Sequence, residues 1–199
     1  MPYDIPRERV DELIDVIGQA FSRSPDPLSD YVFELEPNAL YFKERLFRSI
    51  GEACPPSALR QASSEEMQAI SVWFPPGVTY PDDDESELFD PAEFQSPETP
   101  ERVEGMLRSI GVTIGKLGGG PQWYLHILAT RPEHQGRGHT SPLMKSLFTR
   151  ADEEGLPCTL VCPRHNIPVY EHFGFEVVDE TQFADSDMFI YNMRREPSS

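Results

Sequence analysis

The chain has 199 residues, and its 17 lysines and arginines stand against 34 aspartates and glutamates, giving a formal net charge of -17. Such an acidic chain is poorly suited to nucleic acid or to an anionic membrane, because like charges repel. A cationic or neutral small molecule is a better-matched partner. The length fits one domain, residues 1–199, with a sizeable core.

The chain shows no sign of export or membrane insertion. No apolar run approaches the ~20 residues of a membrane span, and the N-terminus lacks the basic start and apolar centre of a signal peptide. Cys54, Cys158 and Cys162 form an odd set that cannot all pair. We therefore expect a soluble cytoplasmic protein without a membrane partner; the oligomeric state stays open.

The first quarter of the chain predicts two helices. Residues 6–21 carry apolar side chains at helical spacing, with Pro6 near the first turn, and residues 24–27 (Ser-Pro-Asp-Pro) are expected to stop this helix. A second helix is expected to begin with Asn38 as its cap and to end at Gly51.

Two strand candidates, a loop and a helix follow. Residues 58–62 are a weak strand candidate, whereas 67–74 alternate clearly. Residues 78–100 form an acidic, proline-rich loop, in which the run 82–85 is either a solvated segment or an attractor for a cationic substrate. Helical spacing returns over 101–117.

Residues 122–130 alternate with period two and predict a central strand. One face would carry Tyr124, His126, Leu128 and Thr130, and the other Trp123, Leu125, Ile127 and Ala129. Because both faces are largely apolar, helices should cover both sides.

The remaining elements complete an α/β order. A helix around 143–151 precedes a buried strand at 156–162, a short helix at 168–173, and a final pair of strands at 175–179 and 188–193. This order predicts an α/β fold with a mixed central β-sheet flanked by helices in a single domain.

A glycine-bearing turn joins the central strand to the next helix. Gly136 and Gly138 allow close backbone approach, Arg137 adds a positive charge, and a helix N-terminus follows. Together these features predict a nest for an anion such as phosphate. The alternative is an ordinary strand-to-helix turn.

This stretch resembles the pyrophosphate-binding motif of the GNAT superfamily of acyl-CoA-dependent N-acetyltransferases, which reads Gln or Arg, two residues, Gly, one residue, then Gly or Ala. Gln135 and Gly138 match, whereas Thr140 stands where Gly or Ala is expected. Residues 128–134 look like the end of the family's fourth strand, and 166–175 resemble its fourth helix and the Gly-Phe that follows. The resemblance implies a GNAT-like fold and acetyl-CoA as co-substrate.

The resemblance also implies a set of cofactor-binding residues. Backbone groups at the end of the strand would hydrogen-bond the thioester carbonyl and pantetheine, the turn would hold the pyrophosphate, and an asparagine would bind the pantetheine arm or cap the short helix. These residues are Leu128, Ala129, Thr130, Gln135, Gly136, Arg137, Gly138, His139, Thr140 and Asn166.

Two side chains are candidates for acid–base catalysis. His126, inside an apolar strand, could remove a proton from an amine acceptor, because imidazole has a reference pKa near 6.5. Tyr170 stands where many members of the family place a tyrosine that protonates the leaving thiolate. The alternatives are a half-buried histidine satisfied by a neighbour and a tyrosine packed in the core.

Thr140 and Pro142 depart from the family pattern. Local rules predict that the helix begins at Pro142 with Ser141 or Thr140 as its cap, whereas the family begins it nearer Gly138. In a helix that begins early, Pro142 would remove one hydrogen bond and kink the first turns. The cofactor pocket would then be altered or weakened.

No metal site is expected. Cys158, Cys162, His165 and His172 match no common zinc spacing, and the two cysteines fall on one face of a buried strand.

Two functions remain in competition. The first is an acetyltransferase that moves an acetyl group from acetyl-CoA to a small-molecule amine or, with less support, a hydroxyl, by direct attack. The second is a divergent GNAT fold without CoA-dependent transfer, acting as a binding protein or as a lyase or isomerase that uses His126 and Tyr170 as base and acid. A rise in melting temperature with CoA would separate them.

Overall fold

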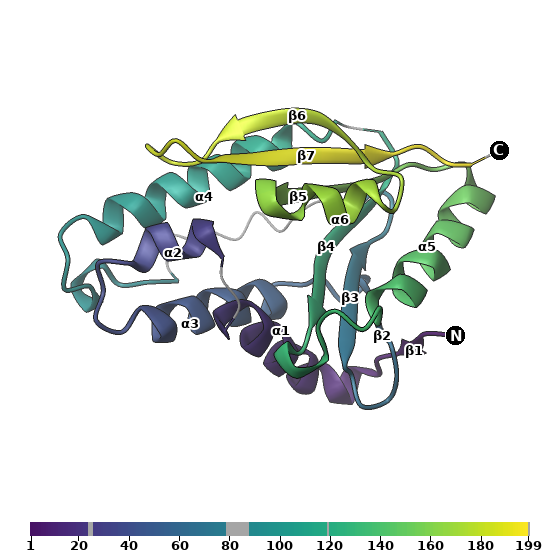
Figure 1. The fold of residues 1–199 in the computed structure, drawn as a ribbon, viewed down its shortest axis with the longest axis horizontal. Coiled ribbons are helices and arrows are strands. Elements are labelled where there is room, and N and C mark those ends of the chain that lie inside the picture. Colours follow the sequence, from purple (N-terminus) through teal and green to yellow (C-terminus); the bar gives the residue numbers. More distant parts are fainter. Residues whose placement is uncertain (24–25, 79–87, 119, 199) are drawn as a thin grey trace.

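The computed structural model describes residues 1–23, 26–78, 88–118 and 120–198 (Figure 1). Ser24, Pro25 and the acidic run at 82–85 lie outside the described residues. Those described form one sheet in the order β1-β2-β3-β4-β5-β7-β6. Its strands are β1 (Tyr3–Asp4), β2 (Leu59–Ala62), β3 (Ala69–Phe74), β4 (Trp123–Thr130), β5 (Cys158–Pro163), β6 (Glu176–Gln182) and β7 (Phe189–Arg195).

The sheet is mixed, as the sequence predicts. β4 and β5 pair in parallel, and every other neighbouring pair of strands is antiparallel. The parallel pair requires a crossover, and α5 provides it by packing on β3 and β4. The expectation of an α/β fold with a mixed sheet is confirmed. The short strand β1 is an addition that no pattern in the sequence indicates.

Helices cover both faces of the sheet. α1, α2, α3 and α4 share one side, and α5 and α6 lie on the other (Figure 1). The helices are α1 (Val10–Arg23), α2 (Pro27–Phe33), α3 (Ala39–Glu52), α4 (Thr99–Gly115), α5 (Thr140–Glu154) and α6 (Ile167–Glu171), with short 3-10 turns η1 (Arg7–Arg9), η3 (Pro91–Glu93), η4 (Pro132–His134) and η5 (Arg164–Asn166).

α2 is a helix that the sequence patterns miss. A carboxylate oxygen of Asp26 accepts a hydrogen bond from the Ser29 backbone N–H at 3.1 Å, and Pro27 occupies the first helical position. Asp followed by Pro is a helix start, because it supplies a cap and a fixed φ. Asp26 and Pro27, which the sequence predicts to stop the first helix, therefore begin the next one.

The prediction that α3 ends at Gly51 is wrong by one residue, and Gly51 has a different role. A Cβ atom at this position would lie 2.9 Å from Cδ1 of Ile17 on α1. Glycine therefore lets α1 and α3 approach closely.

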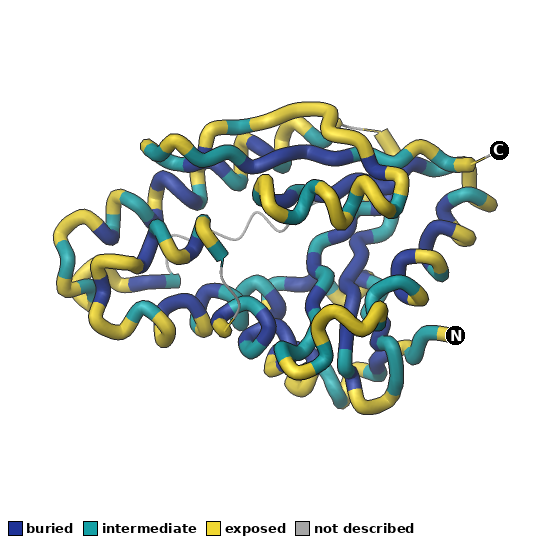
Figure 2. Tube along the Cα trace, in the orientation of Figure 1, coloured by how far each residue is buried: buried dark blue, intermediate teal, exposed yellow. Residues whose placement is uncertain are grey.

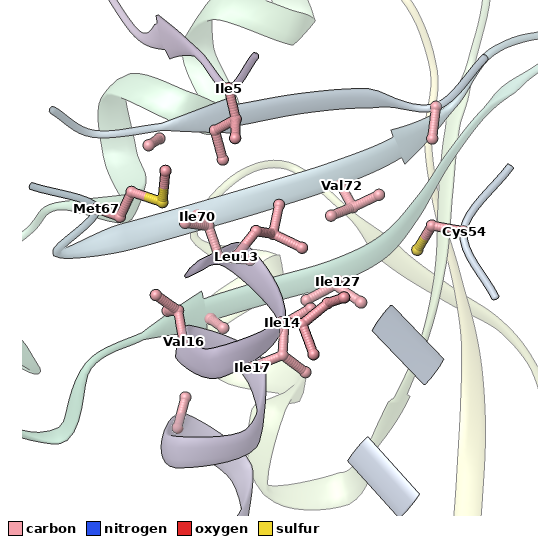
Figure 3. Packing of buried hydrophobic residues seen from close by; sticks show 14 of the residues in the cluster. Ile5, Leu13, Ile14, Val16, Ile17, Cys54, Met67, Ile70, Val72 and Ile127 are labelled. Carbon is pink, nitrogen blue, oxygen red and sulfur yellow. The ribbon is translucent and has the colours of Figure 1, made fainter. Parts of the chain in front are cut away.

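The largest core cluster lies between α1 and the centre of the sheet. Figure 3 shows Leu13, Ile14, Val16 and Ile17 of α1 directed toward the aliphatic side chains of β3 and β4. Figure 2 shows that the central strands consist largely of buried residues, whereas β6 at the edge of the sheet is largely exposed. The centre of the sheet is thus the closely packed part on which a site can be built.

A β-bulge in β4 overturns the predicted division of its faces. Trp73 pairs with Leu125 but the preceding residue Val72 pairs with Ile127, so His126 is one residue extra on β4. Before the bulge, odd-numbered side chains face α5; after it, Ile127 and Ala129 face α1 while Leu128 packs on the α5 side. Strict period two fails because both His126 and Ile127 project toward the same side of the sheet.

Candidate active site

β4 and β5 separate where the predicted site residues gather. Their parallel pairing covers Trp123 to Leu125 on β4 and Cys158 to Leu160 on β5, although both strands continue further. Figure 1 shows the two strands diverging toward their carboxyl ends. Ligands of α/β folds commonly bind beyond the carboxyl ends of parallel strands, where unpaired backbone groups face the opening.

The end of β4 directs particular backbone groups into this opening. The Arg131 N–H donates to Gln68 O at 2.9 Å, so the backbone of Arg131 faces the β3 side. Because these groups alternate along a strand, those of Thr130 and Leu128 face the β5 side, whereas those of Ala129 face β3. Of the three predicted cofactor contacts on β4, Leu128 and Thr130 therefore have the orientation that a ligand between the strands requires.

The turn between η4 and α5 has the shape of an anion nest. Gly136 and Gly138 both adopt left-handed conformations, with φ of 72° and 78°. They and their neighbours Gln135 and Arg137 are exposed, and no acidic residue occupies the first turn of α5. Among the described residues Arg137 has no ion-pair partner, so its charge is available to an anion.

Other side chains frame this turn. The Gln135 side-chain amide donates to Thr130 O at 3.4 Å, which links the turn to the end of β4. The rings of His134 and His139 meet edge to face at 5.7 Å. Arg131 is directed elsewhere, since its guanidinium donates to Met67 O and to Gln19 on α1. Arg137 is therefore the basic side chain best placed for a phosphate.

α5 begins at Thr140, two residues earlier than the local rules predict, with His139 in the cap position and no side-chain cap. Pro142 thus occupies the third helical position, where a backbone N–H has no partner within the helix. Proline therefore breaks no helical hydrogen bond, and the expected kink has no cause. Its cost is different, because it removes one of the amides that could face an anion.

Asn166 and Tyr170 follow β5 through η5 and α6. Asn166 precedes the first residue of α6, yet its side chain makes no capping hydrogen bond. Tyr170 packs on the α5 side of the sheet with its ring 6.0 Å from that of Phe175. Burial raises the pKa of the Tyr170 phenol, and the nearby Cys162 thiol and Tyr124 phenol raise it further. The phenol consequently stays protonated at any physiological pH.

His126 lies at the bulge, on the side of β4 that faces α1 and α3. Its Nε2 atom is 3.4 Å from Ile50 O, and its ring lies 4.7 Å from that of Phe74. A carbonyl oxygen only accepts, so Nε2 carries the proton and Nδ1 is the basic nitrogen. Burial lowers the pKa of His126 to about 4, although the contact with Ile50 O opposes this change. His126 is therefore neutral at pH 7.

Tyr124 and Cys162 belong to the site but were not singled out from the sequence. The Tyr124 ring lies 6.1 Å from that of His126, and burial raises the pKa of its phenol. Burial also raises the pKa of Cys162 to about 12, which makes it an unreactive thiol. Period two predicts Tyr124 beside His126, but no local pattern indicates that Tyr170 on α6 lies near Tyr124 and Cys162.

A cavity of about 190 Å³ opens over His126 and Tyr124. Helices supply its walls, and β4 and β5 supply its floor. Its lining residues are Asp26, Leu28, Ser29, Leu46, Phe47, Ile50, Met106, Ile110, Ile114, Tyr124, His126, Val161, Cys162, Pro163, Phe183 and Ile190. An acceptor in this cavity would lie on the opposite side of the sheet from α5 and the turn that precedes it.

A buried carboxylate holds two walls of this cavity together. Glu36 follows α2 and is 5% exposed. It accepts hydrogen bonds from the backbone of Gln95 and Ser96, each at 3.0 Å, and from the Thr99 hydroxyl at 2.6 Å. These bonds lower the pKa of Glu36, against the effect of burial, which raises it. Because Thr99 begins α4, Glu36 sets the spacing between α2 and α4.

Metal chemistry has no assembled ligand set here. Within the described part of the chain, no three His, Cys, Asp or Glu side chains come together as metal ligands. Cys158 and Cys162 are buried in β5, whereas His165 and His172 are exposed.

In the described part of the chain, no helix combines the length and apolarity that a membrane span requires.

Comparison with known proteins centres on this region. Residues 120–178 match the family described as the acetyltransferase (GNAT) domain. An uncharacterised N-acetyltransferase of Schizosaccharomyces pombe is 43% identical over 54 residues, which are 27% of this chain and 22% of the relative. The chain thus matches about a fifth of that relative's length.

Solved structures share the fold across the whole chain. A Corynebacterium glutamicum protein described as histone acetyltransferase HPA2 and related acetyltransferase has a TM-score of 0.59 and 16% identity, covering 100% of this chain and 97% of its own. Arylalkylamine N-acetyltransferase 2 of Aedes aegypti has a TM-score of 0.58 and 14% identity, covering 100% and 99%. At such identities the likeness concerns the fold.

Proposed function

We propose that this chain, whose residues 120–178 match the acetyltransferase (GNAT) domain, is a GNAT N-acetyltransferase that moves an acetyl group from acetyl-CoA to a small-molecule amine. The observation that carries this proposal is the divergence of β4 from β5, which has the nest on α5 on one side and the cavity over His126 on the other. A donor and an acceptor could meet in the opening between the strands.

The residues around the opening fit acetyl-CoA. Gly136 and Gly138 have open space where a Cβ would stand, so a phosphate can approach the backbone closely. Arg137 and the first amides of α5 would hold the pyrophosphate, and Asn166 with the backbone of Leu128 and Thr130 would hold the pantetheine arm. Bound in this way, acetyl-CoA supplies an activated acetyl thioester.

A backbone amide on β4 is also the main electrostatic contribution in this proposal. The Leu128 N–H faces the opening, where the thioester carbonyl would accept its hydrogen bond. An amide fixed in a strand needs no reorganisation as negative charge develops on that oxygen. Removal of one such donor in other enzymes costs about 100- to 1000-fold in rate.

His126 would receive the proton that the amine loses as its nitrogen bonds to the acetyl carbon. With a pKa of about 4, His126 is a far weaker base than a free alkylamine, whose conjugate acid has a reference pKa near 10. We therefore assign the capture of the proton to the moment of bond formation, when the nitrogen becomes more acidic. His126 is neutral at pH 7, so its imidazole is in the protonation state that this role requires throughout the physiological range.

Tyr170 would donate its proton to the sulfur as the C–S bond of the thioester breaks. Its raised pKa keeps the phenol protonated, and its proximity to Tyr124 and Cys162 puts it beside the opening. The two assignments divide the acid–base work between the two sides of the sheet. The amine loses its proton to the side lined by His126, and the sulfur gains one from the side of α6.

The test is a transfer assay with purified protein, acetyl-CoA and a panel of small amines. Free CoA thiol and acetylated amine would be measured together, so that hydrolysis of the thioester is distinguished from transfer. We expect acetyl-CoA to raise the melting temperature and acetylated product to form in step with thiol. Turnover of an amine or other small molecule without any acyl-CoA would contradict the proposal.

A further inference from the structure

The cavity over His126 has walls of one chemical kind. Apart from Asp26, Ser29 and His126, its described lining consists of aliphatic, aromatic and sulfur-containing side chains. A hydrocarbon body therefore gains free energy when it leaves water for this cavity, in proportion to its buried apolar area. A polar body would lose its hydration without finding partners.

The cavity offers an acceptor a single balancing charge. Asp26 is the only lining residue among those described that is charged at pH 7, since burial keeps His126 neutral. The described lining contains no lysine or arginine, so a carboxylate or phosphate on the acceptor would be buried there without a cation. One carboxylate balances one ammonium group, and a second ammonium would be left unpaired.

The position of Asp26 in the fold makes this charge separable from folding. Its carboxylate caps α2 by accepting the Ser29 N–H. Asparagine caps helices about as well as aspartate. The charge can therefore be removed while the start of α2 is retained.

The cavity is also small. Its volume of about 190 Å³ lies below the roughly 300 to 1,000 Å³ of pockets that hold drug-sized ligands. A side chain of a protein or a short aliphatic or aromatic amine would fit such a space, but a protein acceptor would also bring polar backbone to a mostly apolar surface.

We infer that the acceptor is a small primary monoamine with an uncharged, apolar body, and that Asp26 is the carboxylate that attracts its ammonium group. This inference rests on the proposed function and narrows its substrate class. In the transfer, the bound ammonium first releases one proton to water; the N–C bond then forms and the thioester C–S bond breaks. The nitrogen gives its second proton to His126, the sulfur takes one from Tyr170, and CoA leaves as the thiol. No oxidant or reductant is involved.

The test uses three acceptors with the same carbon chain and different far ends. Hexylamine ends in a methyl group, aminocaproate in a carboxylate and hexamethylenediamine in a second ammonium. We expect kcat/KM with acetyl-CoA for hexylamine to exceed that for aminocaproate by about 100-fold and that for the diamine by about tenfold. Equal or faster turnover of either charged compound would overturn the inference.

Two matched variants test the role of the carboxylate. Asp26→Asn should raise the KM for hexylamine by about tenfold, since one charge-assisted contact is lost. Asp90→Asn removes the same charge at the cap of η3, outside the cavity lining, and should leave this KM unchanged. Equal effects of the two substitutions would reduce Asp26 to a contribution to overall charge and contradict its assignment.

A binding measurement separates failure of this inference from failure of the proposed function. Hexylamine alone should raise the melting temperature of the protein, and aminocaproate at the same concentration should not. Binding of hexylamine without its acetylation would support the chemistry of the cavity and contradict the transferase. Acetylation of aminocaproate in preference to hexylamine would support the transferase and contradict the chemistry of the cavity. The absence of both binding and transfer would overturn both.

Discussion

The two sides of β4 are built in opposite ways. The proposed cofactor side, made of residues 128–140 with Asn166 and Tyr170, is nearly continuous in sequence, exposed at residues 135–138 and rich in backbone donors. The acceptor side, the lining of the cavity over His126, collects residues from Asp26 to Ile190 and is mostly apolar. A motif can therefore identify the first side, whereas the second exists only once α2, α3 and α4 have packed on the sheet.

This contrast explains where specificity can change. The cofactor side depends on positive φ angles, free amides and one basic side chain, and few sequences satisfy those requirements. The acceptor side depends on the volume and polarity of side chains on four elements, which can vary without loss of the fold. One donor chemistry can then serve many acceptors.

The largest expected effect is that of replacing Tyr170. Tyr170→Phe should lower kcat by at least about 100-fold, because loss of a general acid costs roughly 100- to 10,000-fold. The affinity for acetyl-CoA, measured by calorimetry, should stay the same. Tyr41→Phe, at an exposed tyrosine on α3, is the matched control and should leave kcat unaffected. An undiminished kcat in Tyr170→Phe would return this residue to a packing role.

The second prediction concerns His126 and pH. Its pKa of about 4 lies below the unfolded value near 6.5, so the unfolded chain binds more protons between these values. Native stability should be free of this penalty above pH 6.5 and should fall by about 3 kcal/mol between pH 6.5 and pH 4. Urea unfolding of the wild type and of His126→Gln should show that the variant lacks this loss. Parallel curves for the two proteins would mean that His126 titrates normally.

The third prediction concerns Glu36, which holds α2 and α4 together but does not line the cavity. Glu36→Gln replaces a carboxylate that accepts three hydrogen bonds with an amide whose NH₂ group faces donors, at a cost of about 2 kcal/mol in stability. The KM for the amine should rise while acetyl-CoA affinity is retained. Glu34→Gln, which loses only the exposed ion pair with Arg102, is the control. If the affinity for acetyl-CoA fell as well, the two sides would not be independent.

The smallest expected effect tests the nest. Gly138→Ala forces a left-handed conformation on a residue with a Cβ, at a cost of about 1 kcal/mol in stability. It should also weaken acetyl-CoA binding by about tenfold as the turn relaxes. Gly118→Ala carries the same strain, with φ of 85°, in a turn distant in sequence from the nest. Gly118→Ala should lower the stability but leave the affinity for acetyl-CoA unchanged. If both variants lost the same acetyl-CoA affinity, the turn at Gly136 and Gly138 would not be the cofactor-binding nest.

The sequence predicted the fold class, most helices and the central strand because these depend on local periodicity. It failed where a tertiary requirement prevailed. The sequence predicts a stop at Asp26 and Pro27, whereas α2 begins there. A helix as short as α2 shows little local periodicity, and it is stabilised mainly by its packing against α3 and α4. Gly51 was read as a helix end because glycine does not reveal whether it serves a turn or a close contact. The cavity lining has no local pattern at all.

The bulge at His126 gives β4 a property that neither half of the strand has alone. One extra residue allows a single strand to contribute alternate positions to the core under α5 and then to the core under α1. Deletion of His126 would restore a regular ladder with β3 and would leave the pairs of residues 128–130 unchanged, so the amides of Leu128 and Thr130 would still face the opening. What β4 would lose is the second of two consecutive side chains on the side that faces α1 and α3. The irregular position therefore adds one side chain to the cavity without altering the direction of the backbone where a ligand would bind.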